Sequence, residues 1–234
     1  MKLTQAEVLN PFVDYSAALQ QAALKGYAFC PHVILPKACQ AMEQEVSQLE
    51  FEAGDYSAQP IEEHKRTKVT QRHERFYRPI DDCHVPIARL VSQALISQAH
   101  QARADSSAAG NPIHDLANWA PSEIGYQRYR DGGDHISPHR DRRTDQFLGA
   151  TVTIHGSALV RIHEPLNDPD DYTDLSQVDE CETSPGSLML LRAPGFGVGR
   201  QAIHEVLPPR SGSRLILNLR MRPDVLKAPN QEAK

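Results

Sequence analysis

The feature that most constrains the fold is a stretch of alternating side chains from Arg214 to Arg222. Its odd-numbered positions are all apolar, whereas its even-numbered positions hold three arginines, Asn218 and Ile216. Successive side chains of a strand point to opposite faces, so the pattern predicts a strand that packs its leucines outward against helices. The polar row would then face a cavity, and several arginines turned toward a cavity require an anion there.

A second group of polar side chains precedes this strand. His139 and Asp141 stand at positions i and i+2, so an extended segment would aim an imidazole and a carboxylate into one cavity. His204 follows 63 residues after Asp141 and lies ten residues before Arg214. Two histidines and one carboxylate leave three coordination positions open on one side of a metal, an arrangement that suits non-haem Fe(II) oxygenases. The sequence therefore predicts an iron site that can still accept substrates.

Residues 124–129 form a further predicted strand, in which two polar side chains share one face. With these motifs the chain resembles the Fe(II)/2-oxoglutarate-dependent oxygenase superfamily, and most nearly its AlkB-like branch, over roughly residues 120–222. The pattern of that branch is an Asn-x-Tyr strand, His-x-Asp, a distal His and Arg-x5-Arg. The matching positions are Gln127 and Tyr129, His139 and Asp141, His204, and Arg214 and Arg220.

The resemblance implies roles for these positions. The two histidines and Asp141 would bind Fe(II), with 2-oxoglutarate and O2 as cosubstrates and succinate and CO2 as coproducts. Arg214 and Tyr129 would hold the far carboxylate of 2-oxoglutarate, and Gln127 would help to hold the near one. Arg220 belongs to the same cofactor-binding group. A guanidinium suits this task because its planar fork matches a carboxylate.

The substrate is less constrained. Gln127 replaces the Asn usual in the AlkB-like branch, and Ile216 stands where nucleic-acid demethylases carry Asn. The net charge of -5 and the pI of about 6.1 give no general attraction to nucleic acid or to anionic membranes. We therefore expect an oxygenase that hydroxylates or otherwise oxidises a small molecule.

Three alternatives stay open. The first is AlkB-like oxidative N-demethylation of nucleic acid, favoured by the spacing of the two arginines. The second is a non-catalytic, cupin-like metal-binding module, suggested by Pro185-Gly186 and Pro194-Gly195 ahead of His204. The third is an oxygenase fold used only as a scaffold, against which the intact triad argues.

Two charged segments flank the motifs. The basic run from His64 to Arg78 is read either as a solvated face or as a lid over the iron that recruits an anionic substrate. The acidic segment from Glu164 to Glu182 is poor in apolar residues, so we expect a solvated loop between strands.

The predicted fold is mainly β, a double-stranded β-helix or jelly-roll core with N-terminal buttressing helices. The 234 residues suit one oxygenase domain, because single β barrels commonly span roughly 200 to 250 residues. Within it we expect a helical buttress and substrate-lid region (1–112), a catalytic jelly roll (113–222) and a flexible tail (223–234). Four cysteines without a C-x-x-C pair predict reduced thiols. With neither an apolar leader nor a membrane span in view, we expect a cytoplasmic protein. The oligomeric state is left open.

The local patterns also predict individual elements. Helices are expected over Tyr15 to Lys25, from Pro36 onward and over Val85 to His100, with a loop from Arg103 to Pro112. Strands are expected at Tyr27 to Cys30 and at Ser187 to Leu191, with a hairpin of Gly149 to Ile154 and Ala158 to His163 around Gly156-Ser157.

Overall fold

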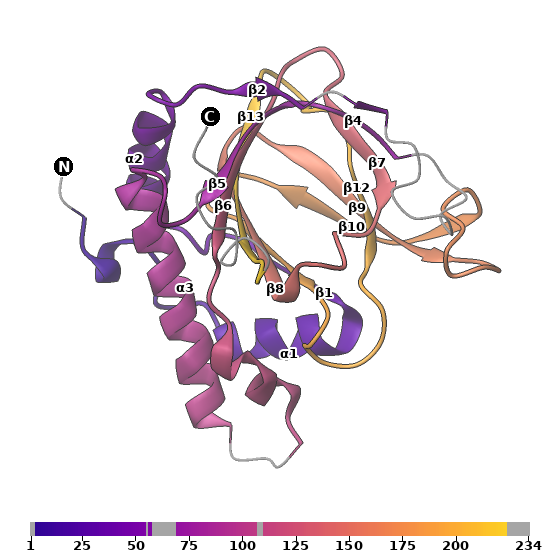
Figure 1. The fold of residues 1–234 in the computed structure, drawn as a ribbon, viewed down its shortest axis with the longest axis horizontal. Coiled ribbons are helices and arrows are strands. Elements are labelled where there is room, and N and C mark those ends of the chain that lie inside the picture. Colours follow the sequence, from indigo (N-terminus) through magenta and orange to yellow (C-terminus); the bar gives the residue numbers. More distant parts are fainter. Residues whose placement is uncertain (1–2, 55, 58–68, 107–109, 224–234) are drawn as a thin grey trace, which may run out of the picture.

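Two antiparallel sheets face each other and enclose the centre of the molecule, with the helices on one side (Figure 1). The computed structural model describes residues 3–54, 56–57, 69–106 and 110–223. Helices α1 and α2 contact the larger sheet, and α3 packs on both of them. This is the predicted mainly β jelly-roll core with N-terminal buttressing helices.

The helices are α1 (Tyr15–Lys25), α2 (Pro36–Val46) and α3 (Pro86–Asp105), with short 3-10 helices η1 (Gln5–Glu7) and η2 (Pro112–Asn118). The larger sheet has the order β1 (Tyr27–Cys30), β11 (Leu188–Arg192), β8 (Gln146–His155), β13 (Arg214–Met221), β6 (Glu123–Tyr129), β5 (Glu74–Pro79) and β2 (Glu52–Ala53). The smaller sheet has the order β10 (Leu175–Thr183), β9 (Ala158–Pro165), β12 (Ile203–Val206), β7 (His135–His139), β4 (Thr70–Arg72) and β3 (Tyr56–Ser57).

The predicted helices are present, and their ends have local causes. Helix α1 ends at Gly26, whose φ of 91° lies in the left-handed region that favours glycine. Helix α3 runs to Asp105, so the loop predicted from Arg103 begins later, and its expected end at Pro112 instead opens η2. Proline suits the first helical turn, because the N–H it lacks would have no intrahelical partner there.

Strand β13 shows the predicted alternation. Its three leucines at positions 215, 217 and 219 are buried in the cluster shared with the helices. Each fully buried leucine contributes roughly 1.5–3 kcal/mol. The side chains at 214, 216, 218 and 220 line the cavity between the sheets. One face of the strand therefore packs against the helices, and the other face lines the cavity.

The predicted hairpin of 149–154 and 158–163 is wrong in its pairing. Both strands exist, but β8 pairs with β11 and β13, whereas β9 pairs with β10 and β12. The turn at Gly156 carries the chain from one sheet to the other. Its φ is 70°, and a Cβ there would collide with the carbonyl oxygen of Ser213, so glycine is required. Local patterns identify strands, whereas their partners depend on the whole fold.

The acidic segment predicted as a loop is largely strand. Strand β9 continues through Pro165 and pairs with β10, so only residues 166–174 lie between these strands. Strand β10 forms one edge of its sheet and exposes Gln177, Glu180 and Glu182, while Cys181 and Thr183 turn inward. An edge strand with one solvated face needs few apolar residues, which explains the error.

Four further expectations can be compared with the structure. From the basic run, residues 64–68 lie outside the described residues, while residues 70–72 and 74–79 extend the two sheets as β4 and β5. Of the predicted tail, residues 224–234 also lie outside them. None of the described helices is long and apolar enough to cross a membrane. The cysteines are free thiols, and burial raises the pKa of Cys39 and Cys181 to about 11.

Candidate metal centre and cosubstrate pocket

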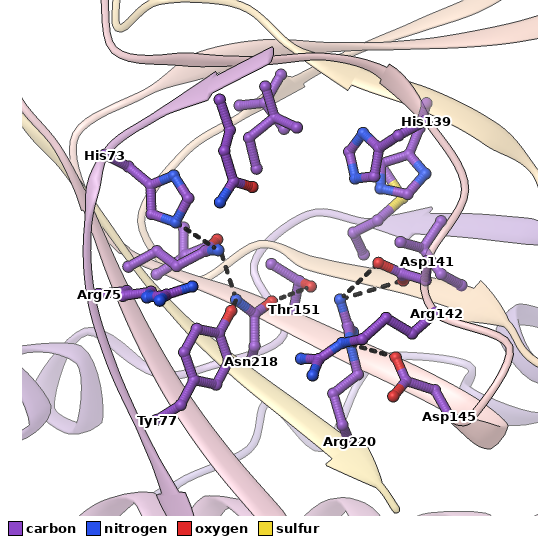
Figure 2. A pocket seen from close by; sticks show the side chains of 18 of the residues that line it. His73, Arg75, Tyr77, His139, Asp141, Arg142, Asp145, Thr151, Asn218 and Arg220 are labelled. Carbon is purple, nitrogen blue, oxygen red and sulfur yellow. Dashed lines mark hydrogen bonds and ion pairs between the residues drawn. The ribbon is translucent and has the colours of Figure 1, made fainter. Parts of the chain in front are cut away.

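His139, Asp141 and His204 come together at the wall of the cavity between the sheets. Figure 2 shows the His139 ring and the Asp141 carboxylate on the same side of this cavity. Their ligand atoms all lie within 4.8 Å of one another. The pairing of β7 with β12 sets His139 opposite His204, and the two ring centroids are 4.3 Å apart. Strand β7 ends at His139, so Asp141 follows the strand instead of continuing it. The short connection still brings its carboxylate beside both rings.

The hydrogen bonds of the two histidines fix which ring nitrogen faces the centre. Nδ1 of His139 lies 2.8 Å from the carbonyl oxygen of Ser137, and Nδ1 of His204 lies 3.3 Å from that of Ala202. A carbonyl oxygen only accepts, so each Nδ1 carries the hydrogen and each Nε2 keeps its lone pair. Burial lowers the pKa of both histidines, which keeps them neutral. Neutral imidazole is the form that binds a metal.

The carboxylate of Asp141 is held by Arg220. The guanidinium Nη2 lies 3.1 Å from one carboxylate oxygen and 3.2 Å from the other, while Nε lies 3.4 Å from Asp145. Burial alone would raise the pKa of Asp141, but the positive charges of Arg220 and Arg142 act against burial, and the pKa is lowered. The carboxylate is therefore ionised and oriented, as a metal ligand must be. Arg220 thus contacts two carboxylates inside the cavity.

Arg214 is a buried cation with no acidic partner among the described residues. Its side chain donates to Oγ1 of Thr153 at 3.3 Å, but its Nε and Nη1 have no hydrogen-bond partner among the described residues. Tyr129 stands opposite it on β6, with its ring centroid 5.4 Å from the guanidinium carbon. Burial lowers the pKa of Arg214 to about 10, so it stays protonated near neutral pH. An unpaired charge is costly to bury, so this pocket fits a carboxylate.

Tyr129 and Gln127, which were also predicted to hold the cosubstrate, are joined by a hydrogen bond. The hydroxyl of Tyr129 donates to Oε1 of Gln127 at 2.9 Å, and Nδ2 of Asn218 donates to the same oxygen at 3.1 Å. Oγ1 of Thr151 in turn donates to Oδ1 of Asn218 at 2.7 Å. His73 stacks on Tyr129, with ring centroids 5.5 Å apart. The chain of contacts fixes both predicted side chains at the cavity wall.

Three residues of the basic run from His64 to Arg78, which the sequence left between a solvated face and a lid over the iron, reach the cavity. His73, Arg75 and Tyr77 line the cavity from β5 and the residue before it. They alternate with outward positions, so a period of two was the available signal. Tyr77 lies against Gly125, where any Cβ would collide with its ring. Glycine on β6 therefore makes room for Tyr77 in the cavity.

Two arginines anchor the backbone around the triad. Arg140, between two of its members, donates through Nε to the carbonyl of Gln201 at 2.8 Å. Arg192 is buried and donates to three backbone carbonyls, two of which lie in the segment leading to His204. These bonds connect the approach to His204 with β7 and β11. The sequence gives little sign of them, because the acceptors are main-chain atoms.

Comparisons with known proteins agree on the fold. No family model and no curated protein matches the chain. A prolyl hydroxylase from Trichoplax adhaerens, solved in complex with a peptide fragment of the hypoxia inducible factor oxygen degradation domain, superposes with a TM-score of 0.60 at 13% identity, covering 92% of this chain and 93% of that one. A Pseudomonas putida prolyl-4-hydroxylase gives 0.55 at 13% identity, covering 88% of this chain and 97% of that one. The chain thus shares the fold of these two enzymes.

Proposed function

We propose that the protein is an Fe(II)- and 2-oxoglutarate-dependent oxygenase. One observation carries the proposal: a single cavity holds both a His/Asp/His group and a buried guanidinium that has no counter-ion in the described part of the chain. The open side of such a triad suits chelation by the keto acid end of 2-oxoglutarate. Arg214 suits the far carboxylate of the same molecule. The fold shared with two prolyl hydroxylases supports the same class.

Different side chains have different roles in this reaction. His139, Asp141 and His204 would hold the iron. When bound, the iron supplies the oxidation chemistry, in which O2 and 2-oxoglutarate give succinate, CO2 and one oxygen atom for the substrate. Arg214 orients the cosubstrate, and Arg220 holds the carboxylate of Asp141 in place. Because Asp141 is present, no ligand position is left for a halide, which favours hydroxylation over halogenation.

For the substrate we propose a small molecule. The cavity has a volume of about 690 Å³. Pockets for small ligands commonly span roughly 300–1,000 Å³. A peptide is the second candidate, because the Trichoplax adhaerens enzyme was solved with a peptide fragment. N-demethylation of nucleic acid is disfavoured by Ile216, an apolar side chain that lines the cavity where the demethylases carry Asn.

The test is succinate formation. Protein reconstituted with Fe(II) under nitrogen is mixed with 2-oxoglutarate and air, either alone or with pools of small metabolites, proline-containing peptides or methylated oligonucleotides. We expect slow succinate release alone and faster release with one metabolite pool. Stimulation by peptides or by oligonucleotides, with formaldehyde in the latter case, would replace the small-molecule assignment. A protein that neither binds 2-oxoglutarate nor releases succinate would contradict the oxygenase proposal.

A further inference from the structure

A second cavity arginine has no acidic partner within residues 3–54, 56–57, 69–106 and 110–223. Arg75 lies on β5, is partly buried and makes no hydrogen bond or ion pair within the described part of the chain. Glu52 stands opposite it on β2, but that carboxylate is mostly exposed and lies 3.7 Å from Arg78. Figure 2 shows the guanidinium of Arg75 directed into the cavity, on the side of Asn218. The guanidinium of Arg75 is therefore available to bind an anion in the cavity.

Other arginines of the cavity are engaged by acids. Arg220 contacts Asp141 and Asp145, as described above. Arg142 and Arg222 both reach Glu123, at 3.4 and 2.9 Å. These contacts lie where β6 begins and β13 ends, whereas Arg75 is paired with Gln127 further along β6. An anion that bound there would have to displace a carboxylate, whereas no described carboxylate pairs with Arg75.

The strand register separates Arg75 from Arg214. Tyr129 is opposite Arg214, while Gln127 is opposite both Ile216 and Arg75. Arg75 is therefore two strands across and two residues along from Arg214. With strands about 4.8 Å apart and about 3.4 Å per residue, the two Cα atoms are on the order of 12 Å apart. The two side chains therefore start from different places on the cavity wall, and the strand that carries Gln127 lies between their strands.

We propose that Arg75 is a specificity-determining residue that binds an anionic group of the substrate, a carboxylate or a phosphate. The inference rests on the proposed function, because it assigns Arg214 to 2-oxoglutarate and leaves Arg75 for the molecule to be oxidised. A guanidinium presents a planar fork that pairs with either anion through two hydrogen bonds. The substrate is then a small acid that enters with its anionic end toward β5.

Binding of simple anions tests this without a known substrate. Protein loaded with Mn(II) and saturated with 2-oxoglutarate is titrated calorimetrically with acetate and, separately, with inorganic phosphate. The comparison covers wild type, Arg75→Met, Arg75→Lys and Arg78→Met, the last being a control that removes a nearby arginine already paired with Glu52. Circular dichroism and thermal melting check that each variant is folded.

We expect Arg75→Met to weaken binding of the preferred probe at least tenfold, which is about 1.4 kcal/mol. Arg75→Lys should retain part of the affinity, and Arg78→Met should stay within about twofold of wild type on the same scale. The probe that binds more tightly to wild type identifies the group as carboxylate or phosphate. No Arg75-dependent binding of either probe would overturn the inference.

The outcomes also separate this inference from the oxygenase proposal. If Arg75→Met weakens 2-oxoglutarate itself, Arg75 belongs to the cosubstrate site and the inference fails, while the oxygenase proposal stands. If wild type releases no succinate yet shows Arg75-dependent anion binding, the anion site stands and the oxygenase proposal fails.

Discussion

Replacing Arg214 by methionine should have opposite effects on stability and on cosubstrate binding. The side chain is only 2% exposed, and two of its nitrogens have no partner among the described residues. Burial lowers its pKa from 12.5 to about 10. At about 1.36 kcal/mol per pKa unit, the charge costs the ligand-free folded state about 3 kcal/mol.

The sign follows from the direction of the shift. The folded-state pKa lies below the unfolded value, so the penalty is fully present below pH 10 and fades between about pH 10 and 12.5. At pH 7, the ligand-free Arg214→Met protein should therefore unfold at higher urea concentration than wild type. Lost contacts with Tyr129 offset part of this gain, so we expect a net increase of about 1–2 kcal/mol.

Binding of 2-oxoglutarate should change in the other direction. Truncating one partner of a buried charged pair costs about 2–5 kcal/mol, or roughly 30-fold or more in Kd. Calorimetry with Mn(II)-loaded protein measures this directly. A variant with wild-type affinity for 2-oxoglutarate refutes the role of Arg214. A ligand-free variant less stable than wild type refutes the claim that its charge is uncompensated.

Two further substitutions test the supports of the site. Gly149→Ala should weaken Mn(II) binding about 10–100-fold, because the new Cβ would displace the guanidinium of Arg220 from the carboxylate of Asp141. Calorimetric titration measures this change. An unchanged affinity would show that metal binding does not need Arg220. Glu45→Ala should cost about 2 kcal/mol or more in urea unfolding, since its carboxylate accepts from the N–H groups of Ile87 and Ala88 and from the hydroxyl of Tyr126. A loss below about 0.5 kcal/mol would contradict that role.

The sequence predicted those parts of the site that depend on local alternation. The polar face of β13 and the pair on β6 follow from a period of two, and the structure places both at the cavity. The order of His139, Asp141 and His204 indicated a shared site. The structure places their ligand atoms close together, although Asp141 lies beyond its strand. These side chains share a site because their strands are neighbours or face each other.

Contacts and strand pairings between distant parts of the sequence could not be predicted from such local patterns. The turn at Gly156 was compatible with a hairpin, and only the fold shows that β8 and β9 join different sheets. Strand β10 lacks the apolar signal of a strand because one face is solvated. The contact of Arg220 with Asp141 depends on how β13 approaches the end of β7, which no spacing along the chain reveals.

Anaerobic titration with Fe(II) tests the central claim most directly. Wild type should bind one Fe(II) per chain and should then bind one 2-oxoglutarate. The variant with His139, Asp141 and His204 all replaced by alanine should lose Fe(II) binding while keeping the circular dichroism spectrum of the wild type. A triple variant that binds Fe(II) as tightly as wild type would contradict the assignment of the metal centre and, with it, the proposed chemistry.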